Sequence, residues 1–455
     1  MKKRRYLAMM CCALAALSGC GGNVDSKADG TSAADSMAAV STDEQKTTTT
    51  TADTTQTTTT SQTSALPADP EKESPLLQLE QRHLYQAEWS ETHQMAMAEM
   101  ECLTVYADEK CAAKYAALAQ TLTDVSGMLE VNAQQDYDWL VGAAEDTLPE
   151  GAEGFLPYVI HLDTKVRRAD AAAVSIRYET YHRNPYDDGS TSIWGGTYDP
   201  QTGRELFLPD IVTDMEAFAE AVRDVLTLKV GADVFYSENS IQNYFREYGA
   251  DATNWTLEYN GISVYFAAGD IATLDNGAME VMISFAEYPR LFQEKYTLVP
   301  ESYMVHLAAE VPFFPDLDGD GSDDELIVWD SYEHDNIVDA TWYLSTKEGY
   351  YEEQVMAYDC IPYYIKAADG KHYVYLFAEQ GTQYYLYVYA IGNETIRKVG
   401  EVNVSPYYKD GVSALLTDPH RMHFDVFDAE AGSGGGVPVG DGFFYVGADG
   451  MPVMQ

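Results

Sequence analysis

The segment Trp255-Thr256-Leu257-Glu258-Tyr259-Asn260-Gly261-Ile262-Ser263-Val264-Tyr265-Phe266 predicts a β-hairpin. The dipeptide Asn260-Gly261 separates two runs of aromatic and β-branched residues, and this pattern is the strongest short signal for a tight turn between antiparallel strands. Met279–Phe285 has a similar composition and predicts a further strand. This part of the chain is therefore expected to build a sheet from short consecutive strands.

Strands also dominate the sequence before the hairpin, but helices interrupt them. Apolar residues at positions 111, 115, 118, 122, 125 and 129 recur every three or four residues and predict the buried face of one helix. A second helical stretch is expected over 134–146, and the capping-box spacing of Thr213 and Glu216 predicts where another helix begins. The expected strands are Tyr85–Trp89, Gln94–Tyr106, Tyr158–Leu162, Val174–Tyr181 and Ser192–Tyr198.

Aromatic-rich strands follow one another from residue 341 to residue 402, separated by turns that contain glycine. The end of the chain, Asp441–Pro452, predicts a last strand with an exposed tail. We therefore expect an α+β fold, with a mixed strand–helix domain over residues 76–300 and a mostly antiparallel β domain over residues 301–455. The second domain is similar to part of a propeller sheet but shows no regular sequence repeat.

Several short stretches resemble a known family. They are Ser175–Glu179, Tyr198–Leu206, Leu208–Ile211 and Gly261–Phe266, and they are similar to motifs of the domain of unknown function DUF3298. The strand–helix part upstream is similar in layout to the DUF4163 (PdaC-like) segment that usually precedes it. The resemblance covers roughly residues 80–300. It implies the extracytoplasmic fold of RsiV-type, lysozyme-sensing anti-sigma factors and of the non-catalytic part of some peptidoglycan deacetylases.

The sequence also departs from the pattern of this family. Members often carry a Gly-Gly-Ala-His type loop after the first of these strands, whereas this chain has His182 in a rewritten loop that continues to Gly189. Anti-sigma members add a transmembrane helix and a cytoplasmic segment, and deacetylase members add a catalytic domain; we recognise neither in this sequence. The resemblance therefore implies a fold and a surface-binding role rather than a signalling output.

The N-terminus has the pattern of a lipoprotein signal. Basic residues from Lys2 to Arg5 precede an apolar run from Tyr6 to Leu17, and Leu17-Ser18-Gly19-Cys20 resembles a bacterial lipobox. We expect residues 1–19 to be a signal peptide, and Cys20 to carry acyl chains such as palmitate that hold the protein at the extracytoplasmic face of the cell membrane. The alternative is an ordinary signal peptide with a chance cysteine. Residues 20–75 are rich in Thr and Ser and predict a disordered tether.

The charge of the chain narrows the choice of partners. The 455 residues contain 73 acidic and 28 basic side chains, which gives a formal net charge of −45. Such a surface repels nucleic acid and anionic lipid head groups, and it attracts cations, calcium and basic proteins. We therefore expect no nucleic-acid partner. The alternative interpretation of the acidity is that it only keeps a secreted protein soluble.

Three cysteines follow the lipobox, and two of them are candidates for a disulfide. Cys102 and Cys111 are close in sequence and flank turn-like residues, so they are the natural pair in an oxidising compartment. Cys360 would then remain as a small buried hydrophobic residue. The cysteine spacing does not resemble a zinc site.

The clearest chemical motif is the acidic loop Asp316-Leu317-Asp318-Gly319-Asp320-Gly321-Ser322-Asp323-Asp324. Its spacing suits calcium and resembles the loops of FG-GAP-type β repeats. Ile327 occupies the position of the bidentate glutamate of an EF-hand, so we expect weak structural binding with a Kd of about 10⁻⁴–10⁻³ M. The alternative is an Asp/Gly turn without a metal. The expected ligands are Asp316, Asp318, Asp320, Ser322 (through its backbone carbonyl) and Asp324.

Other constellations give weaker signals. Many tyrosines lie on the expected strands between residues 363 and 389, and exposed ones would stack on sugars or proteins, although core packing explains most of them. His420 and His423 would need further ligands to hold a metal. Ser433-Gly434-Gly435-Gly436 lacks the lysine of a phosphate-binding loop and is interpreted as a flexible loop.

These observations favour a lipid-anchored, non-enzymatic protein of the bacterial envelope that binds an extracellular partner. The resemblance and the charge together suggest a basic protein such as a lysozyme, or a cell-wall component such as peptidoglycan. The alternatives are a cell-wall hydrolase, an accessory protein of a deacetylase, a signalling component related to RsiV-type anti-sigma factors, and a purely structural envelope protein.

Overall fold

The computed structural model describes residues 75–148, 154–185, 189–249, 252, 254–331, 340–355, 357, 359–380, 383–427 and 438–455. All of these residues belong to one compact unit. The expected signal peptide, Cys20 and nearly all of the expected tether lie outside these ranges. No helix in the described ranges is long and apolar enough to cross a membrane.

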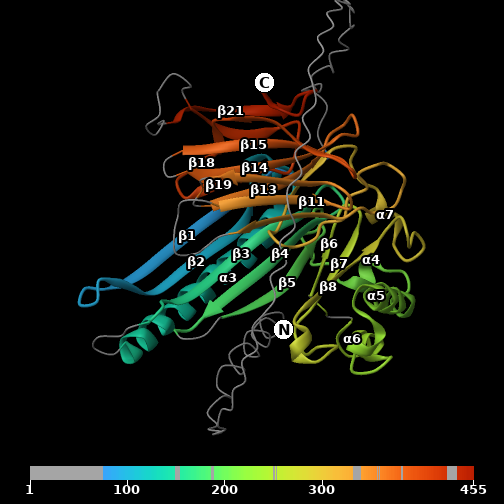
Figure 1. Cartoon of the computed structure of the whole chain (residues 1–455), viewed down its shortest axis with the longest axis horizontal. Coiled ribbons are helices and arrows are strands. Elements are labelled where there is room, and N and C mark those ends of the chain that lie inside the picture. The colour runs from blue at the N-terminus through green and yellow to red at the C-terminus, as the bar shows by residue number, and fades with distance from the viewer. Residues whose placement is uncertain are drawn as a thin grey trace, which may run out of the picture. The chain divides into compact units, whose positions relative to one another are not determined.

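Strands account for most of the regular structure, and they form several mainly antiparallel sheets (Figure 1). The largest sheet has seven strands in the order β18-β19-β1-β2-β3-β4-β5. Strands β2 and β3 run parallel in it, whereas the other neighbouring strands are antiparallel. Its strands are β1 (Leu79–Ser90), β2 (Met95–Ala107), β3 (Tyr158–Ala169), β4 (Val174–Arg183), β5 (Ser190–Tyr198), β18 (Tyr408–Lys409) and β19 (Val412–Leu415).

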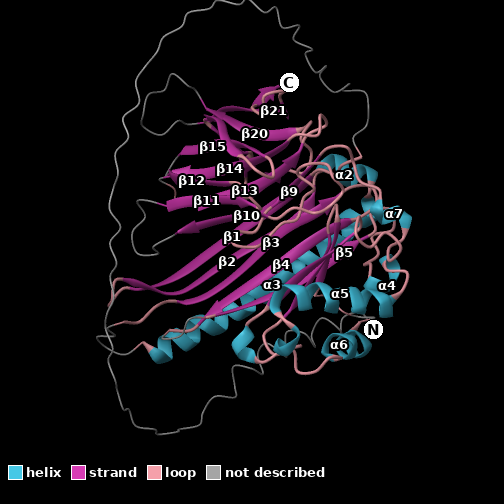
Figure 2. Ribbon diagram, turned by 45° about the vertical axis from the view of Figure 1, so that its right-hand side comes forward, coloured by secondary structure: helices cyan, strands magenta, loops and turns pink. Residues whose placement is uncertain are grey.

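Two helices, α2 (Glu109–Lys114) and α3 (Ala116–Thr147), connect the parallel strands β2 and β3. The Asp108 side chain caps α2 by accepting a hydrogen bond from the Cys111 amide. The two helical stretches predicted from the sequence are thus mostly one long helix, which begins after a break at Tyr115. Figure 2 shows α3 running along the large sheet. Its buried stripe comprises Leu118, Leu122, Ser126, Leu129, Ala133, Tyr137, Leu140 and Ala144.

The expected disulfide between Cys102 and Cys111 is not formed. Both residues are buried in the core under α3 and are free thiols, and Cys360 is also free. After Ala107 the chain does not return as a second strand opposite Cys102 but winds into α2, so the two thiols are not cross-strand neighbours. Burial raises the pKa of both thiols to about 12, which keeps them protonated and unreactive.

The predicted hairpin is confirmed and belongs to a three-stranded antiparallel sheet. Its register places the turn on Tyr259 and Asn260, one residue earlier than the Asn260-Gly261 signal indicates. Gly261 is required for close packing, because a Cβ atom there would lie 2.5 Å from the Ile283 carbonyl oxygen. The strands are β6 (Trp255–Leu257), β7 (Gly261–Phe266) and β8 (Met279–Ser284).

Helix α5 shares a second core with this small sheet. It begins one residue later than the capping-box spacing predicts, since the Asp214 side chain accepts hydrogen bonds from the amides of Glu216 and Ala217. The hydroxyl of Thr213 instead donates to the Arg290 carbonyl. The helices of this region are α4 (Leu208–Ile211), α5 (Met215–Val230), α6 (Ser240–Tyr248) and α7 (Glu294–Thr297).

The described part of the C-terminal third is built from antiparallel strands, as expected. They form sheets in the orders β16-β15-β14-β13-β9, β10-β11-β12 and β17-β20-β21-β22. The strands are β9 (Tyr303–His306), β10 (Leu326–Ser331), β11 (Ala340–Thr346), β12 (Tyr350–Val355), β13 (Asp359–Lys366), β14 (His372–Gln380), β15 (Gln383–Ile391), β16 (Ile396–Val402), β17 (Val404–Pro406), β20 (Met422–Phe427), β21 (Pro438–Val446) and β22 (Pro452–Met454).

The large sheet contains strands from both sides of the expected domain boundary at residues 300 and 301. Strand β19 pairs with β1, so that Leu415 lies opposite Leu79. The Arg167 side chain of β3 adds a second connection by donating a hydrogen bond of 3.0 Å to the backbone carbonyl of His306 in β9. The N-terminal and C-terminal strands therefore meet along an extended junction.

Candidate functional site

The acidic loop is closed at its base by backbone pairing. Phe313 and Leu326 exchange hydrogen bonds of 2.8 and 2.7 Å just outside the loop. Within it, Gly319 and Gly321 have φ angles of 76° and 87°, in the left-handed region that glycine adopts without strain. The glycines therefore allow the chain to turn sharply within the loop.

Three of the five expected calcium ligands converge. Carboxylate oxygens of Asp316, Asp318 and Asp324 lie within 4.8 Å of one another. Asp320 is not part of this group, and its carboxylate accepts a hydrogen bond of 2.7 Å from the Ser322 amide. Because Ca²⁺ takes about 6–8 oxygen ligands from carboxylates, carbonyls and water, the three carboxylates fit as the charged part of such a ligand set.

The acidic loop also contacts two neighbouring sheets. The side-chain amide of Asn393, which follows β15, donates a hydrogen bond of 3.2 Å to Asp318 Oδ2. On the other side, the Asn260 amide donates to the Phe314 carbonyl and, at 3.2 Å, to Asp323 Oδ1. Burial raises the pKa of Asp323 to about 6. The loop thus lies between the hairpin sheet and the five-stranded sheet.

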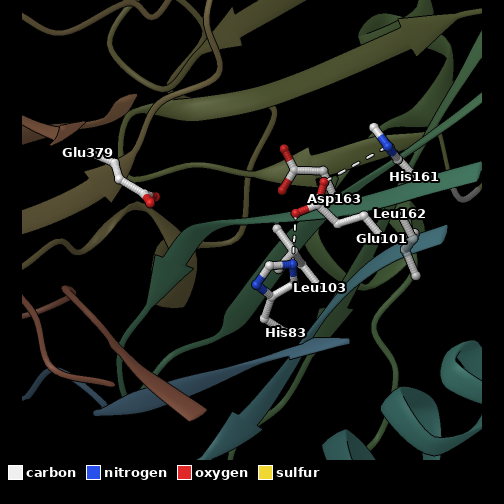
Figure 3. A pocket seen from close by; sticks show the side chains of 7 residues that line it. All are labelled: His83, Glu101, Leu103, His161, Leu162, Asp163 and Glu379. Atoms are coloured by element: carbon white, nitrogen blue, oxygen red, sulfur yellow. Dashed lines mark ion pairs between the residues drawn. The ribbon is translucent and has the colours of Figure 1, made fainter. Parts of the chain in front are cut away.

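A second candidate site, which the sequence analysis missed, lies on the open face of the seven-stranded sheet (Figure 3). Thr104 of β2 donates a hydrogen bond to Glu130 of α3, so this face of the sheet is covered by the helix. Because side chains alternate along a strand, the neighbours of Thr104 in β2 point to the opposite face, where a cavity of about 500 Å³ lies. Glu379 reaches the cavity from β14, and the C-terminal part of the chain thus completes its wall. The lining residues are His83, Glu101, Leu103, His161, Leu162, Asp163 and Glu379.

One carboxylate in this cavity lies between two imidazoles. Glu101 of β2 lies beside His161 of β3 and diagonally across from His83 of β1. Nε2 of His83 is 2.8 Å from Glu101 Oε1, and Nε2 of His161 is 4.0 Å from Glu101 Oε2. The three side chains are 35–41% exposed, so a solute can reach all of them.

Two of the cavity carboxylates are held in the ionised form. The hydrogen bond from His83 lowers the pKa of Glu101, and it outweighs the opposing effect of burial. Burial also acts to raise the pKa of Asp163, but the neighbouring Lys165 ammonium and the His306 ring overcome it and hold that pKa below its usual value. The cavity therefore presents negative charge near neutral pH.

A sequence signal for this face exists in the alternation of polar residues. Glu99 and Glu101 occupy alternate positions of β2, and His161, Asp163 and Lys165 do so on β3. Each strand therefore predicts one polar face. The register between them was not predictable, because β2 and β3 are parallel and a long helical connection separates them.

The tyrosines noted in the sequence mostly serve the core, and a different aromatic cluster is exposed. On one face of the sheet β10-β11-β12, Trp329 stacks on Tyr343 with ring centroids 5.5 Å apart. Tyr350 lies 6.2 Å from Tyr343 and is 56% exposed. We call Trp329, Tyr343 and Tyr350 the aromatic cluster. The buried tyrosines on the predicted strands are Tyr363, Tyr364, Tyr373, Tyr375, Tyr387 and Tyr389.

The structure does not bring His420 and His423 together as ligands of one metal. His420 Nε2 lies 2.8 Å from the Ser302 hydroxyl. His423 lies 2.9 Å from Asp441 and is stacked between two aromatic rings. His182 lies at the end of β4, and burial lowers its pKa. Residues 186–188 of its loop and the glycine-rich segment 433–436 lie outside the described residues.

Two solved structures are similar to part of this chain. One is a DUF3298 family member from Bacteroides fragilis, with 16% identity and a TM-score of 0.34 over 49% of this chain and 96% of that chain. The other is a DUF3298 family protein from Pseudomonas aeruginosa, with 14% identity and a TM-score of 0.33 over 48% of this chain and 96% of that chain. No family model and no curated protein matches the chain. Both similar structures are thus DUF3298 proteins, the family that the sequence motifs resemble.

Proposed function

We propose that this protein is a lipid-anchored, non-enzymatic binding protein of the bacterial envelope that recognises a basic extracellular protein of the lysozyme type. The observation that carries the proposal is the open, carboxylate-lined cavity in a chain with a net charge of −45. Surfaces with one dominant sign of charge steer partners of opposite charge and accelerate their association. A basic protein is therefore the class of partner that this surface favours.

The proposed location follows from the N-terminal sequence. The lipobox ending at Cys20 supports acylation at the extracytoplasmic face of the membrane, and the Thr-rich tether would hold the folded part away from the lipid surface. The short motifs described above support a DUF4163/DUF3298-like organisation of residues 76–300, followed by a β domain. We propose that both parts contribute to binding, since the cavity takes Glu379 from the second of them.

Calcium in this proposal has a structural role. Asp316, Asp318 and Asp324 would hold the ion, and the flanking carbonyls and water would complete its coordination. The loop also bonds to Asn393 and Asn260 of two other sheets. Bound calcium would neutralise the repulsion among the carboxylates and stiffen the junction between these sheets.

The experiment that tests the main proposal is a pull-down of lysozyme by the protein carrying Cys20→Ser, which prevents acylation. We expect capture at low salt that weakens at high salt, because screening reduces attraction between exposed charges. An equally acidic, unrelated protein is the control for nonspecific charge attraction. Failure to capture lysozyme at either salt concentration, or capture no better than this control, would rule the proposal out.

A second candidate partner is a cell-wall glycan, and the aromatic cluster favours it. Stacked, partly exposed aromatic rings provide flat apolar surfaces on which sugar rings pack. Sedimentation with purified peptidoglycan tests this candidate. We expect Trp329→Ala to reduce binding, whereas Trp139→Ala, which removes a 57% exposed tryptophan from α3, serves as the matched control. Equal sedimentation of the two variants would argue against the aromatic cluster as a glycan site.

A further inference from the structure

We propose that the cavity on the open sheet face accepts a cationic side chain, an ammonium or a guanidinium group, and that His83 and His161 make its binding weaken as the pH falls. This inference rests on the proposed function, because the cation would belong to the basic partner. It assigns the recognition to Glu101 and Glu379, which line the cavity from β2 and β14.

The cavity suits a cation because the lysine and arginine side chains near it already pair with other groups of the protein. Lys165 pairs with Asp163, and its side chain is only 14% exposed. Three arginines of β3 and β4 have other partners: Arg167 pairs with Glu258, Arg177 pairs with Glu280, and Arg183 donates to the Pro157 carbonyl. The carboxylates of Glu101 and Glu379 are therefore not neutralised by a lysine or arginine in the described structure. Charge-assisted hydrogen bonds to an incoming cation would supply that neutralisation.

The pH dependence follows from the position of the two imidazoles. Both Nε2 atoms point to Glu101, at 2.8 and 4.0 Å, so protonation would place up to two positive charges beside the carboxylate that receives the cation. Because histidine is the side chain whose charge responds to acidification near neutral pH, binding would weaken as the pH falls. Besides Glu101, the charged and titratable groups that share this face or pack against it are His83, Tyr85, Glu99, His161, Asp163, Lys165, Arg177, Glu179, Tyr181, Arg183, His306 and Glu379.

The geometry favours a cationic side chain over a metal ion. In the described residues, a group of three possible metal ligands within 4.8 Å of one another is found in the acidic loop, and the cavity histidines are not part of it. A tetrahedral metal would require the nitrogens of His83 and His161 to approach each other. A carboxylate between two separated imidazoles instead leaves space for a larger organic cation in a cavity of about 500 Å³.

The test uses lysozyme as the probe and measures its dissociation constant by calorimetry at about pH 7.5 and at about pH 5.5, the more acidic condition. The charge variants are Glu101→Gln and Glu379→Gln, and the control is Glu220→Gln, an exposed glutamate of α5. We expect each cavity variant to weaken binding about tenfold near pH 7.5, as the loss of one charge contact in a partly shielded site does. The dissociation constant of the control variant should stay within about twofold of the wild-type value, because an exposed charge remote from the contact contributes little to binding.

The pH part is tested with the double variant His83→Gln/His161→Gln. Wild-type protein should lose about tenfold in affinity between the two pH values, and the double variant should lose clearly less. Melting curves establish that the variants fold. If wild-type protein binds lysozyme and the cavity variants bind it equally well, the inference is overturned and the proposed function stands. If the double variant keeps the wild-type pH dependence, the role of the histidines is overturned. Absence of lysozyme binding by wild type would instead remove the proposed function on which both depend.

Discussion

Arg167 and Glu258 form a buried ion pair between two sheets, with 2.9 Å from Nη2 to Oε2. Their side chains are 4% and 2% exposed, and Nε of Arg167 also donates to both carboxylate oxygens of Glu258 at 3.0 Å. The same arginine donates to the His306 carbonyl of β9. A single guanidinium therefore connects the large sheet, the hairpin turn and the five-stranded sheet.

We predict that Glu258→Gln lowers the free energy of unfolding by about 3–5 kcal/mol, because it leaves the buried Arg167 charge without its partner. Urea unfolding followed by tyrosine and tryptophan fluorescence measures the change. The control is Asp224→Asn, which breaks an ion pair with Arg223 whose side chains are 36% and 61% exposed. That exposed pair should contribute less than about 1 kcal/mol. Similar losses in the two variants would contradict the role of burial.

Gly195→Ala is predicted to disrupt the contact between β5 and β6. A Cβ atom at Gly195 would lie 1.8 Å from the Trp255 carbonyl oxygen, and a backbone atom cannot move aside as a flexible side chain can. Overpacking typically costs about 1–3 kcal/mol, and we expect the upper end of this range or more. Gly440→Ala is the matched strand control, since nothing lies within 4 Å of a Cβ there. Equal melting temperatures of the two variants would show that β5 can shift at little cost.

The local sequence pattern predicted where helices and strands form better than it predicted which strands pair with each other. The apolar spacing that starts at Cys111 and the strand pattern of β2 depend on neighbours in sequence, and both elements formed, although a break at Tyr115 interrupts the helix. The pairing of β1 with β19 depends on residues more than 300 positions apart, for which neither strand carries a signal. The cavity was missed for the same reason, because Glu379 and Glu101 come to line one cavity only after this long-range assembly.

Short-range details were also changed by packing. The disulfide prediction assumed that the residues after Ala107 reverse direction, whereas Asp108 caps a helix there. In the acidic loop, which is set by its own sequence, the carboxylates of Asp316, Asp318 and Asp324 converge, whereas Asp320 lies outside this group. Whether an aromatic residue faces the core depended on its sheet, so Tyr364 is buried while Tyr350 is exposed.

For the acidic loop, we predict that a chelator lowers the melting temperature and that Asp318→Ala abolishes this difference. At a calcium concentration about 10–100 times the expected Kd, binding to the folded state alone would contribute about 1.4–2.7 kcal/mol. Calorimetric melting with calcium and with chelator measures the effect. Asp275→Asn, an exposed aspartate remote in sequence from the loop, should respond to calcium as wild type does. Unchanged melting of wild type in chelator would exclude a structural calcium site.

The last prediction concerns His306, which is 8% exposed and stacks on Tyr363 with ring centroids 4.9 Å apart. Burial lowers its pKa to about 3 in the folded protein, from the ordinary value of 6.5. Folding therefore favours the neutral form of His306. Its contribution to the free energy of unfolding is complete above pH 6.5, and this contribution is lost as the pH falls from 6.5 toward 3. By about pH 5 the loss would reach about 2 kcal/mol.

His306→Phe keeps a stacked ring at a position whose Nδ1 has no hydrogen-bond partner, so it should flatten this part of the pH dependence. Urea unfolding between pH 7.5 and pH 5 measures the slope, with His93→Phe in the β1–β2 turn as the control. An identical slope in wild type and His306→Phe would show that other groups cause the acid sensitivity.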